Sequence, residues 1–409
     1  MGAKDRIVAI WDHALSGLGR TRSARHIPAP LTYAAVSLLL LVPCFWQPRL
    51  EGGDLSGHIY NSWMTSLIEN GRTLDLTMVH QWTNVLFDLM LSGLFRLLGA
   101  EAAQRIAISL VVLTFVWGAF AFVSVVSGRR SWSLMPSIAM LAYGWVFHMG
   151  FFNFYFSLGL CFWGMALAWE WKAWRIAAAG GVFLLASMAH ALPVIWTLGL
   201  LSYVCLARKR TPFTRACLTG GFVLVLLALH AVIGRMMVAR WSPAQLTMAT
   251  GLDQLWVFDS KYYIVLVALL IVWGLLFLAL IHGSGTRQVV ASVPFQLCIL
   301  SAAAVSILPG TVLIPGFYHA LGFVAERMSL GVAVCVCALL GTVQARTPVR
   351  WAMVVVAIVF FSFLYSDERR VNGFEDRMEN LVAHAPLPRH ATPRQVSSWG
   401  SQSWPPPPF

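Results

Sequence analysis

The chain has 409 residues, of which 58% are hydrophobic and 11% charged, and its mean hydropathy is +0.71. A soluble domain of this size needs a polar surface that this composition cannot supply, whereas repeated apolar runs of about 18–20 residues match the thickness of a bilayer. The net charge of +12 does not indicate nucleic acid, because the basic residues lie in short segments between apolar runs. We therefore expect an all-α, polytopic membrane protein with the lipid bilayer as a partner and no nucleic acid.

The chain begins with a basic segment, residues 1–30, in which apolar residues recur at roughly helical spacing. This pattern is typical of a short amphipathic helix on the cytoplasmic face of a membrane. A transmembrane domain is predicted over 31–366, with about 11 spanning helices by the hydropathy criterion. The predicted spans are 31–48, 105–127, 132–148, 153–170, 175–191, 192–206, 214–232, 262–281, 288–308, 320–341 and 350–366.

The basic N-terminus predicts that the chain starts on the cytoplasmic side of an inner or plasma membrane. The basic clusters between later spans then also fall on the cytoplasmic side. The run 85–98 contains Asp88 and Arg96, and counting it as a span would place those clusters outside, so we interpret it as an interfacial helix. Residues 49–104 thus form a long first extracytoplasmic loop. The tail, 367–409, is rich in Pro and Ser and is predicted to be extracytoplasmic and largely disordered.

The first loop opens with an amphipathic pattern over 54–69. At 100° per residue its polar residues gather on one face and its apolar residues on the other. Asn70-Gly71 then favours the end of a helix. The polar face carries Asp54, His58, Asn61, Ser62, Thr65 and Glu69.

A second helix is predicted over about 80–98, where polar residues recur every four positions: His80, Asn84, Asp88, Ser92 and Arg96. Two interpretations remain open for this pair of helices. Both could lie on the membrane with their polar faces toward water, or their polar stripes could line a cavity while their apolar faces contact lipid or protein.

Further polar residues fall near the same outer boundary, and ionisable groups at membrane depth tend to face a cavity or one another. An arginine at such a boundary suits a phosphate, although Glu326 and Arg327 could also simply neutralise each other. The polar residues near this outer boundary are His148, His190, His230, His319, Glu326 and Arg327.

The order of these parts resembles the GT-C-fold membrane glycosyltransferases. GGDLSGHIYNSWMTSLIENGR is similar to the family's acidic residue on a juxtamembrane helix, and HQWTNVLFDLMLSGLFRLLGAEAAQRIAISLVVLTFVWGAFAFVSVVSGRR is similar to its usual continuation. GFFNFYFSLGLCFWGMALA and the AHALP stretch also resemble uncharacterised bacterial members. The resemblance extends over residues 31–366. Many members have a second acid after the first, whereas Leu55 follows Asp54 here, so the metal requirement stays open.

The resemblance implies that a sugar passes from a polyprenyl-phosphate carrier to a glycan, lipid or protein acceptor on the extracytoplasmic side, with inversion. Asp54 would be the general base, and His58 would orient Asp54, hold its pKa or bind a metal. Arg327 would hold the departing phosphate. The remaining candidates for substrate or phosphate contacts are Glu326, His80, Arg96, Asn61, His148, His190 and His319. The resemblance implies no particular cofactor, and a divalent cation stays open.

Two other classes of function fit the sequence. A transporter or flippase of a polar or lipid-linked solute would have helices broken near the midplane of the membrane, and the breaks at 191–193 and 308–310 lie near the outer boundary instead. A non-catalytic assembly protein of the envelope would tolerate loss of the Asp54 carboxylate. The sugar, the acceptor and the carrier length are not encoded in any motif that we can read.

Overall fold

The computed structural model describes residues 29–72, 76–78, 81–315 and 320–384. The chain forms two compact units, Met1–Val42 and Pro43–Phe409. In the first unit the described residues form one helix, α2 (Ala29–Leu41), which contains no charged residue. The predicted amphipathic helix at the N-terminus lies outside the described residues, apart from its last two positions.

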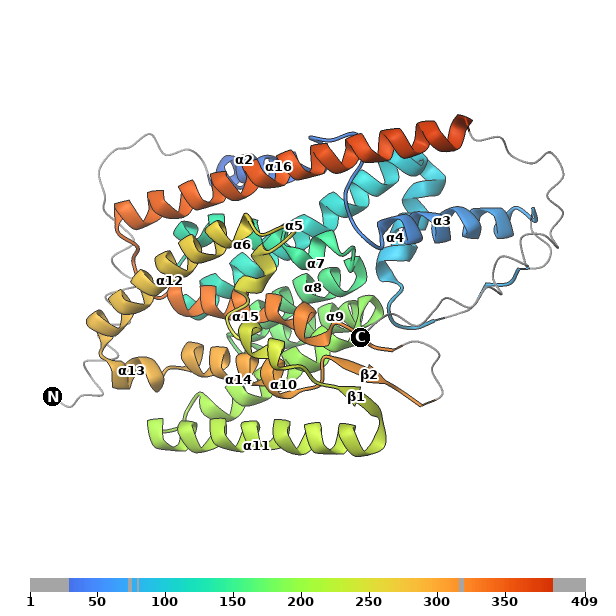
Figure 1. Cartoon of the computed structure of the whole chain (residues 1–409). Helices are drawn as coiled ribbons and strands as arrows, with labels where there is room; N and C mark the ends of the chain where they lie inside the picture. The colour runs from blue at the N-terminus through green and yellow to red at the C-terminus, as the bar shows by residue number, and fades with distance from the viewer. Residues whose placement is uncertain (1–28, 73–75, 79–80, 316–319, 385–409) are drawn as a thin grey trace. The chain divides into compact units, whose positions relative to one another are not determined.

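The second unit is almost entirely helical (Figure 1). Its α-helices are α3 (Leu55–Glu69), α4 (Leu86–Leu98), α5 (Ala100–Ser127), α6 (Met135–Ala142), α7 (Trp145–His148), α8 (Phe152–Ala168), α9 (Ala173–Ala189), α10 (Ala191–Ala207), α11 (Pro212–Met236), α12 (Tyr262–Ser284), α13 (Thr286–Val290), α14 (Val293–Ile307), α15 (Val324–Leu340) and α16 (Thr347–His384). Short 3₁₀ turns are η2 (Val42–Cys44), η3 (Trp132–Leu134), η4 (Pro243–Met248) and η5 (Leu252–Leu255), and two strands are β1 (Val238–Arg240) and β2 (Thr311–Leu313).

The all-α class is confirmed, and every predicted span contains at least one helix. Within the described part of the chain, four helices are long and apolar enough to cross a membrane: α5, α11, α12 and α16. The other apolar helices are shorter, with 10–17 residues. The count of about 11 spans therefore stays a prediction.

The core of the second unit is the contact between α5 and α8. A Cβ atom added to Gly118 would lie 2.4 Å from the carbonyl oxygen of Gly159, so the absence of side chains lets the two backbones approach closely. Beside this contact, the buried rings of Phe115 and Tyr155 stack with centroids 4.5 Å apart. The first turn of α8 is thereby held next to residues 49–104, the predicted first loop, where the candidate site lies.

The two amphipathic helices of the loop are present as α3 and α4. Asp54 is the N-cap of α3. Asn70 is its C-cap and Gly71 has a left-handed φ of +65°, so the helix ends where the sequence predicts. The second helix begins at Leu86 rather than near residue 80. Asn84 has a φ of +61°, and an L-residue in this conformation cannot continue a right-handed helix.

The tail prediction is wrong for residues 367–384, which continue α16 as helix. The side chains of Asp367, Glu368 and Asn372 on this extension are buried, although they are polar. Buried polar groups of this kind need partners, and those partners come from residues 46–51, from His148 and from residues 261–262. Composition alone predicted disorder. It could not show the partners that stabilise this part of α16, because they lie far away along the chain.

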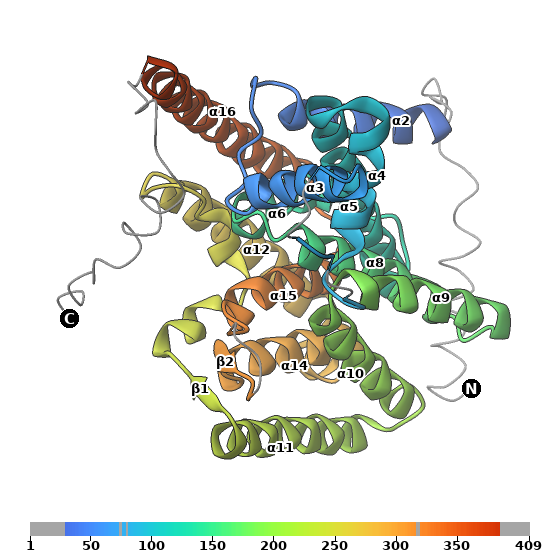
Figure 2. The same ribbon diagram turned by 90° about the vertical axis from the view of Figure 1, so that its right-hand side faces the viewer.

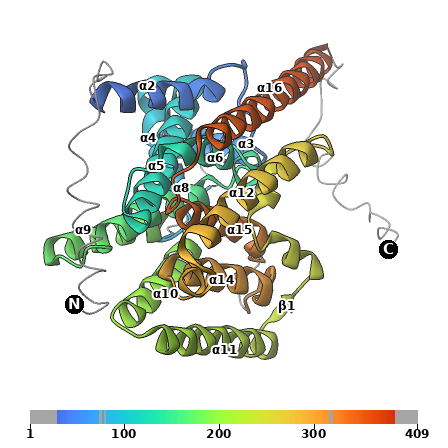
Figure 3. The ribbon, with the colours of Figure 1, turned by 90° about the vertical axis from the view of Figure 1, so that its left-hand side faces the viewer.

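One edge of the second unit is formed by α11 (Figures 2 and 3). β1 follows α11 directly and pairs antiparallel with β2, with Val238 opposite Leu313 and Arg240 opposite Thr311. The two strands form the only sheet among the described residues.

Candidate functional site

Asp54 is fixed through its backbone. The amide of Gly53 donates to the carbonyl of His148 (2.8 Å), and the amide of Asp54 donates to the carbonyl of Met149 (3.1 Å). Gly150 has a φ of +77°, and a Cβ atom there would lie 2.4 Å from the Asp54 nitrogen. The start of α3 is therefore held against the turn between α7 and α8, while the Asp54 carboxylate stays exposed.

Arg327 lies in the first turn of α15, and its guanidinium is packed over the ring of Phe151, 3.7 Å from the centroid. Asp54 and Glu326 are the negative charges that act on this guanidinium. Neither carboxylate is within 4.0 Å of it, and its Nε atom is buried without a hydrogen-bond partner among the described residues. Arg327 therefore has hydrogen-bond donors that its protein neighbours leave unused.

His190 lies near this arginine, at the junction of α9 and α10. Its Nδ1 atom accepts a hydrogen bond from the amide of Leu192 (3.2 Å), which places the imidazole proton on Nε2. The positive charge of Arg327 acts on this ring. Asp54, His190 and Arg327, which are distant in the sequence, thus belong to one polar region.

A buried acid lies beneath the start of α15. Asp253 accepts a hydrogen bond from Ser329 Oγ (2.6 Å), and burial raises the pKa of its carboxyl group to about 7, opposed by this hydrogen bond and by one from Gln254. Its second oxygen and Glu326 Oε2 are buried without partners among the described residues. The polar region around Arg327 therefore extends into the protein.

His58 contacts Asp88 of α4 rather than Asp54. His58 Nδ1 donates to Asp88 Oδ1 (2.6 Å), because the carboxylate can only accept. The buried Asn153 of α8 donates from Nδ2 to Asp88 Oδ2 (2.7 Å), and its Oδ1 accepts from the amide of Phe87 (2.8 Å). These hydrogen bonds orient Asn153, Asp88 and His58 in turn. Nε2 of His58 has no hydrogen-bond partner among the described residues.

The same two helices make two more polar contacts. Ser92 donates to Ser62 (3.1 Å), and Arg96 forms an ion pair with Glu69 (2.6 Å) at the exposed end. With His58–Asp88 these contacts form a ladder between α3 and α4. Neither interpretation of the two polar stripes is fully correct, because the stripes mainly face each other.

His148 divides its polar atoms among three neighbours, and its Nδ1 donates to the carbonyl of Gly144 (3.1 Å). Its carbonyl holds Gly53, whereas its Nε2 lies 3.2 Å from Glu368 Oε1 on α16, and both side chains are at most 7% exposed. Trp46 donates to the other oxygen of Glu368. The imidazole of His148 therefore contacts α16 and does not face the region around Arg327.

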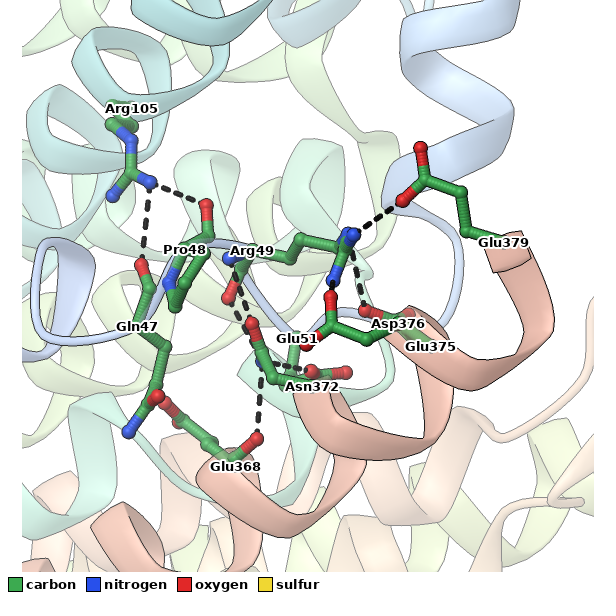
Figure 4. A network of polar contacts seen from close by, with 10 residues as sticks. All are labelled: Gln47, Pro48, Arg49, Glu51, Arg105, Glu368, Asn372, Glu375, Asp376 and Glu379. Atoms are coloured by element: carbon green, nitrogen blue, oxygen red, sulfur yellow. Dashed lines mark hydrogen bonds and ion pairs between the residues drawn. The ribbon is translucent and has the colours of Figure 1, made fainter. Parts of the chain in front are cut away.

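The segment before Asp54, residues 44–51, is hydrogen-bonded to α16 and α5 (Figure 4). Asn372 accepts from the amide of Arg49 (2.9 Å) and donates to the Glu51 carboxylate (2.6 Å). From α5, Arg105 donates to the carbonyls of Cys44 and Gln47. Burial, followed by the negative charges of Glu375 and Glu368, raises the pKa of Glu51 to about 7.

The remaining predicted site residues are not brought to Arg327. Asn61 is exposed on α3, and Arg96 is engaged with Glu69. His80 and His319 lie outside the described residues. In the described part of the chain, no group of three or more His, Cys, Asp or Glu side chains is placed to hold a metal ion.

Sequence reasoning missed three residues that organise this region: Phe151, Asn153 and Asp253. Asn153 could have been found, because a single amide in the apolar run FFNFYF must find hydrogen bonds inside the protein. Phe151 carried no comparable signal, since aromatic residues surround it in the sequence.

No protein family model, no curated protein and no solved structure matches this chain.

Proposed function

We propose that the chain is a membrane glycosyltransferase that moves a sugar from a polyprenyl-phosphate carrier to an extracytoplasmic acceptor, with inversion at the sugar carbon. The observation that carries this proposal is the pair of Asp54 and Arg327. The Asp54 carboxylate acts electrostatically on the Arg327 guanidinium, but the two groups do not form an ion pair. Such a pair offers a base and a phosphate ligand to one substrate.

In this mechanism the acceptor hydroxyl loses its proton to Asp54 while its oxygen bonds to the sugar carbon. The bond from that carbon to the phosphate oxygen breaks, and its electron pair stays on the phosphate. Arg327 stabilises the charge on the leaving phosphate, since a guanidinium donates two parallel hydrogen bonds to phosphate oxygens. Phe151 holds the guanidinium plane in place from one side.

The test compares wild type with Asp54→Asn and Arg327→Gln, each loaded with polyprenyl-phosphate sugars and candidate acceptors. Carrier consumption should fall about 10²–10⁴-fold in Asp54→Asn, the usual contribution of a general base. Arg327→Gln should slow consumption and weaken carrier binding as well. Glu69→Gln, at the far end of the same helix, is the matched control and should retain wild-type activity.

Undiminished transfer by Asp54→Asn would contradict the mechanism. If wild type consumes no carrier but exchanges solute across vesicle membranes, the chain is a transporter instead. If it does neither, a non-catalytic assembly role is favoured.

A further inference from the structure

The helix α11 has no buried residue along its 25 positions. Its apolar side chains are exposed on several sides, including Leu224 at 67% and Val225 at 63%. A helix that is this apolar and this exposed is stable only in an apolar medium. The surface of α11 therefore fits contact with lipid chains.

A cavity of about 480 Å³ opens where α11 ends and the β1–β2 sheet begins. Six of its seven lining residues are apolar, and the seventh is an arginine in the last turn of α11. The lining residues are Arg235, Met236, Met237, Val238, Leu313, Ile314 and Pro315.

The charge of Arg235 is not balanced within the cavity. The lining contains no acidic residue, and Arg235 makes no hydrogen bond or ion pair with any described residue. A guanidinium beside apolar walls complements a ligand that has both an anionic head and a hydrocarbon part.

We propose that this cavity binds an anionic phospholipid of the surrounding bilayer, with the phosphate at Arg235 and one acyl chain on the apolar walls and along α11. The cavity is continuous with α11 at Arg235 and Met236, so a lipid lying against the helix can reach it. A soluble phosphate compound would leave the apolar walls uncovered. A zwitterionic lipid would bring no net charge to the arginine.

The test measures lipids retained by the full chain, purified in detergent micelles and mixed with equal amounts of phosphatidylglycerol and phosphatidylcholine. Native mass spectrometry counts each bound lipid. Wild type should retain phosphatidylglycerol preferentially, and Arg235→Gln should reduce that preference about fivefold, the usual effect of one basic residue near an anionic headgroup.

Arg240→Gln is the matched control, because Arg240 lies in the same sheet but does not line the cavity. It should retain the wild-type preference. Leu313→Trp, which places a larger side chain in the cavity, should reduce retention of both lipids. Three results would overturn the proposal: no preference in wild type, an equal loss in the two arginine variants, or displacement of phosphatidylglycerol by inorganic phosphate at equal concentration.

Discussion

At the scale of single residues, the chain is organised by polar side chains that find partners inside an apolar protein. His58, Asp88 and Asn153 come from three different helices and are joined by two hydrogen bonds of 2.6 and 2.7 Å. In a medium of low polarity an unpaired polar group is costly, so each member of this chain fixes the orientation of the next.

Asp88→Asn should reverse the tautomer of His58. Asn153 donates toward position 88, so the new carboxamide must turn its oxygen to Asn153 and its NH₂ group to His58. His58 then accepts at Nδ1 and carries its proton on Nε2. Nitrogen-15 NMR of labelled histidine should report this change directly.

Transfer activity should fall by about two orders of magnitude or more, because Nε2 of His58 changes from a hydrogen-bond acceptor to a donor. Ser92→Ala removes a different contact between the same two helices and should leave the tautomer unchanged. A wild-type tautomer in Asp88→Asn would show that Asn153 does not orient position 88.

At the scale of elements, the ends of helices place the candidate site. The turn between α7 and α8 accepts two backbone hydrogen bonds from residues 53 and 54, and α15 starts with Arg327 in its first turn. Helix ends have free backbone groups, so they can hold a neighbouring segment without using its side chains. The Asp54 carboxylate is left available for this reason.

Gly150→Ala should displace Asp54. The new Cβ atom would lie 2.4 Å from the Asp54 nitrogen, in addition to the left-handed conformation that costs an L-residue about 1–2 kcal/mol. Gly71→Ala is the matched control, because its φ is also positive (+65°) but its Cβ would meet nothing within 4 Å.

Thermal unfolding and carrier consumption should both be affected more in Gly150→Ala than in Gly71→Ala. Equal effects in the two variants would mean that the packing of Gly150 against Asp54 does not position the carboxylate.

At the scale of the whole second unit, its first residues are joined to α16. Residues 46–51, near its start, contact the last helix through Glu368 and Asn372. Because the same segment leads directly to Asp54, the position of α16 and the position of the site are linked. Glu51 lies at this junction and carries the raised pKa.

Stability should therefore fall as pH rises from about 4.5 to about 7. The pKa of Glu51 is raised from 4.5 to about 7 in the folded chain, so between these values the folded state binds more protons than the unfolded state. The free energy of unfolding decreases across that window and no longer depends on Glu51 above it. Asp253, with its pKa also raised to about 7, adds a decrease of the same sign.

Glu51→Gln retains an acceptor for Asn372 and removes the titration, so melting temperatures measured from pH 4.5 to 7 should fall less steeply than in wild type. Glu101→Gln, whose side chain is 80% exposed, is the control and should follow wild type. A slope in Glu51→Gln identical to wild type would contradict the role of this carboxyl group.

The sequence by itself determined the all-α class, the positions of the apolar helices and the whole of α3 with its end at Asn70-Gly71. These features follow from local patterns: apolar content, a 3.6-residue period and the residues at helix ends. It also singled out Asp54, His190 and Arg327, because ionisable residues at the edge of apolar runs are conspicuous.

Only the tertiary structure decided which of these residues meet. It paired His58 with Asp88 instead of Asp54, turned His148 toward Glu368, and made residues 367–384 part of a folded helix. It also showed that Phe151 holds Arg327. Each outcome depends on contacts between segments that are distant in the chain. The 3.6-residue period of a helix predicts which face is polar, but it does not predict which partner that face contacts.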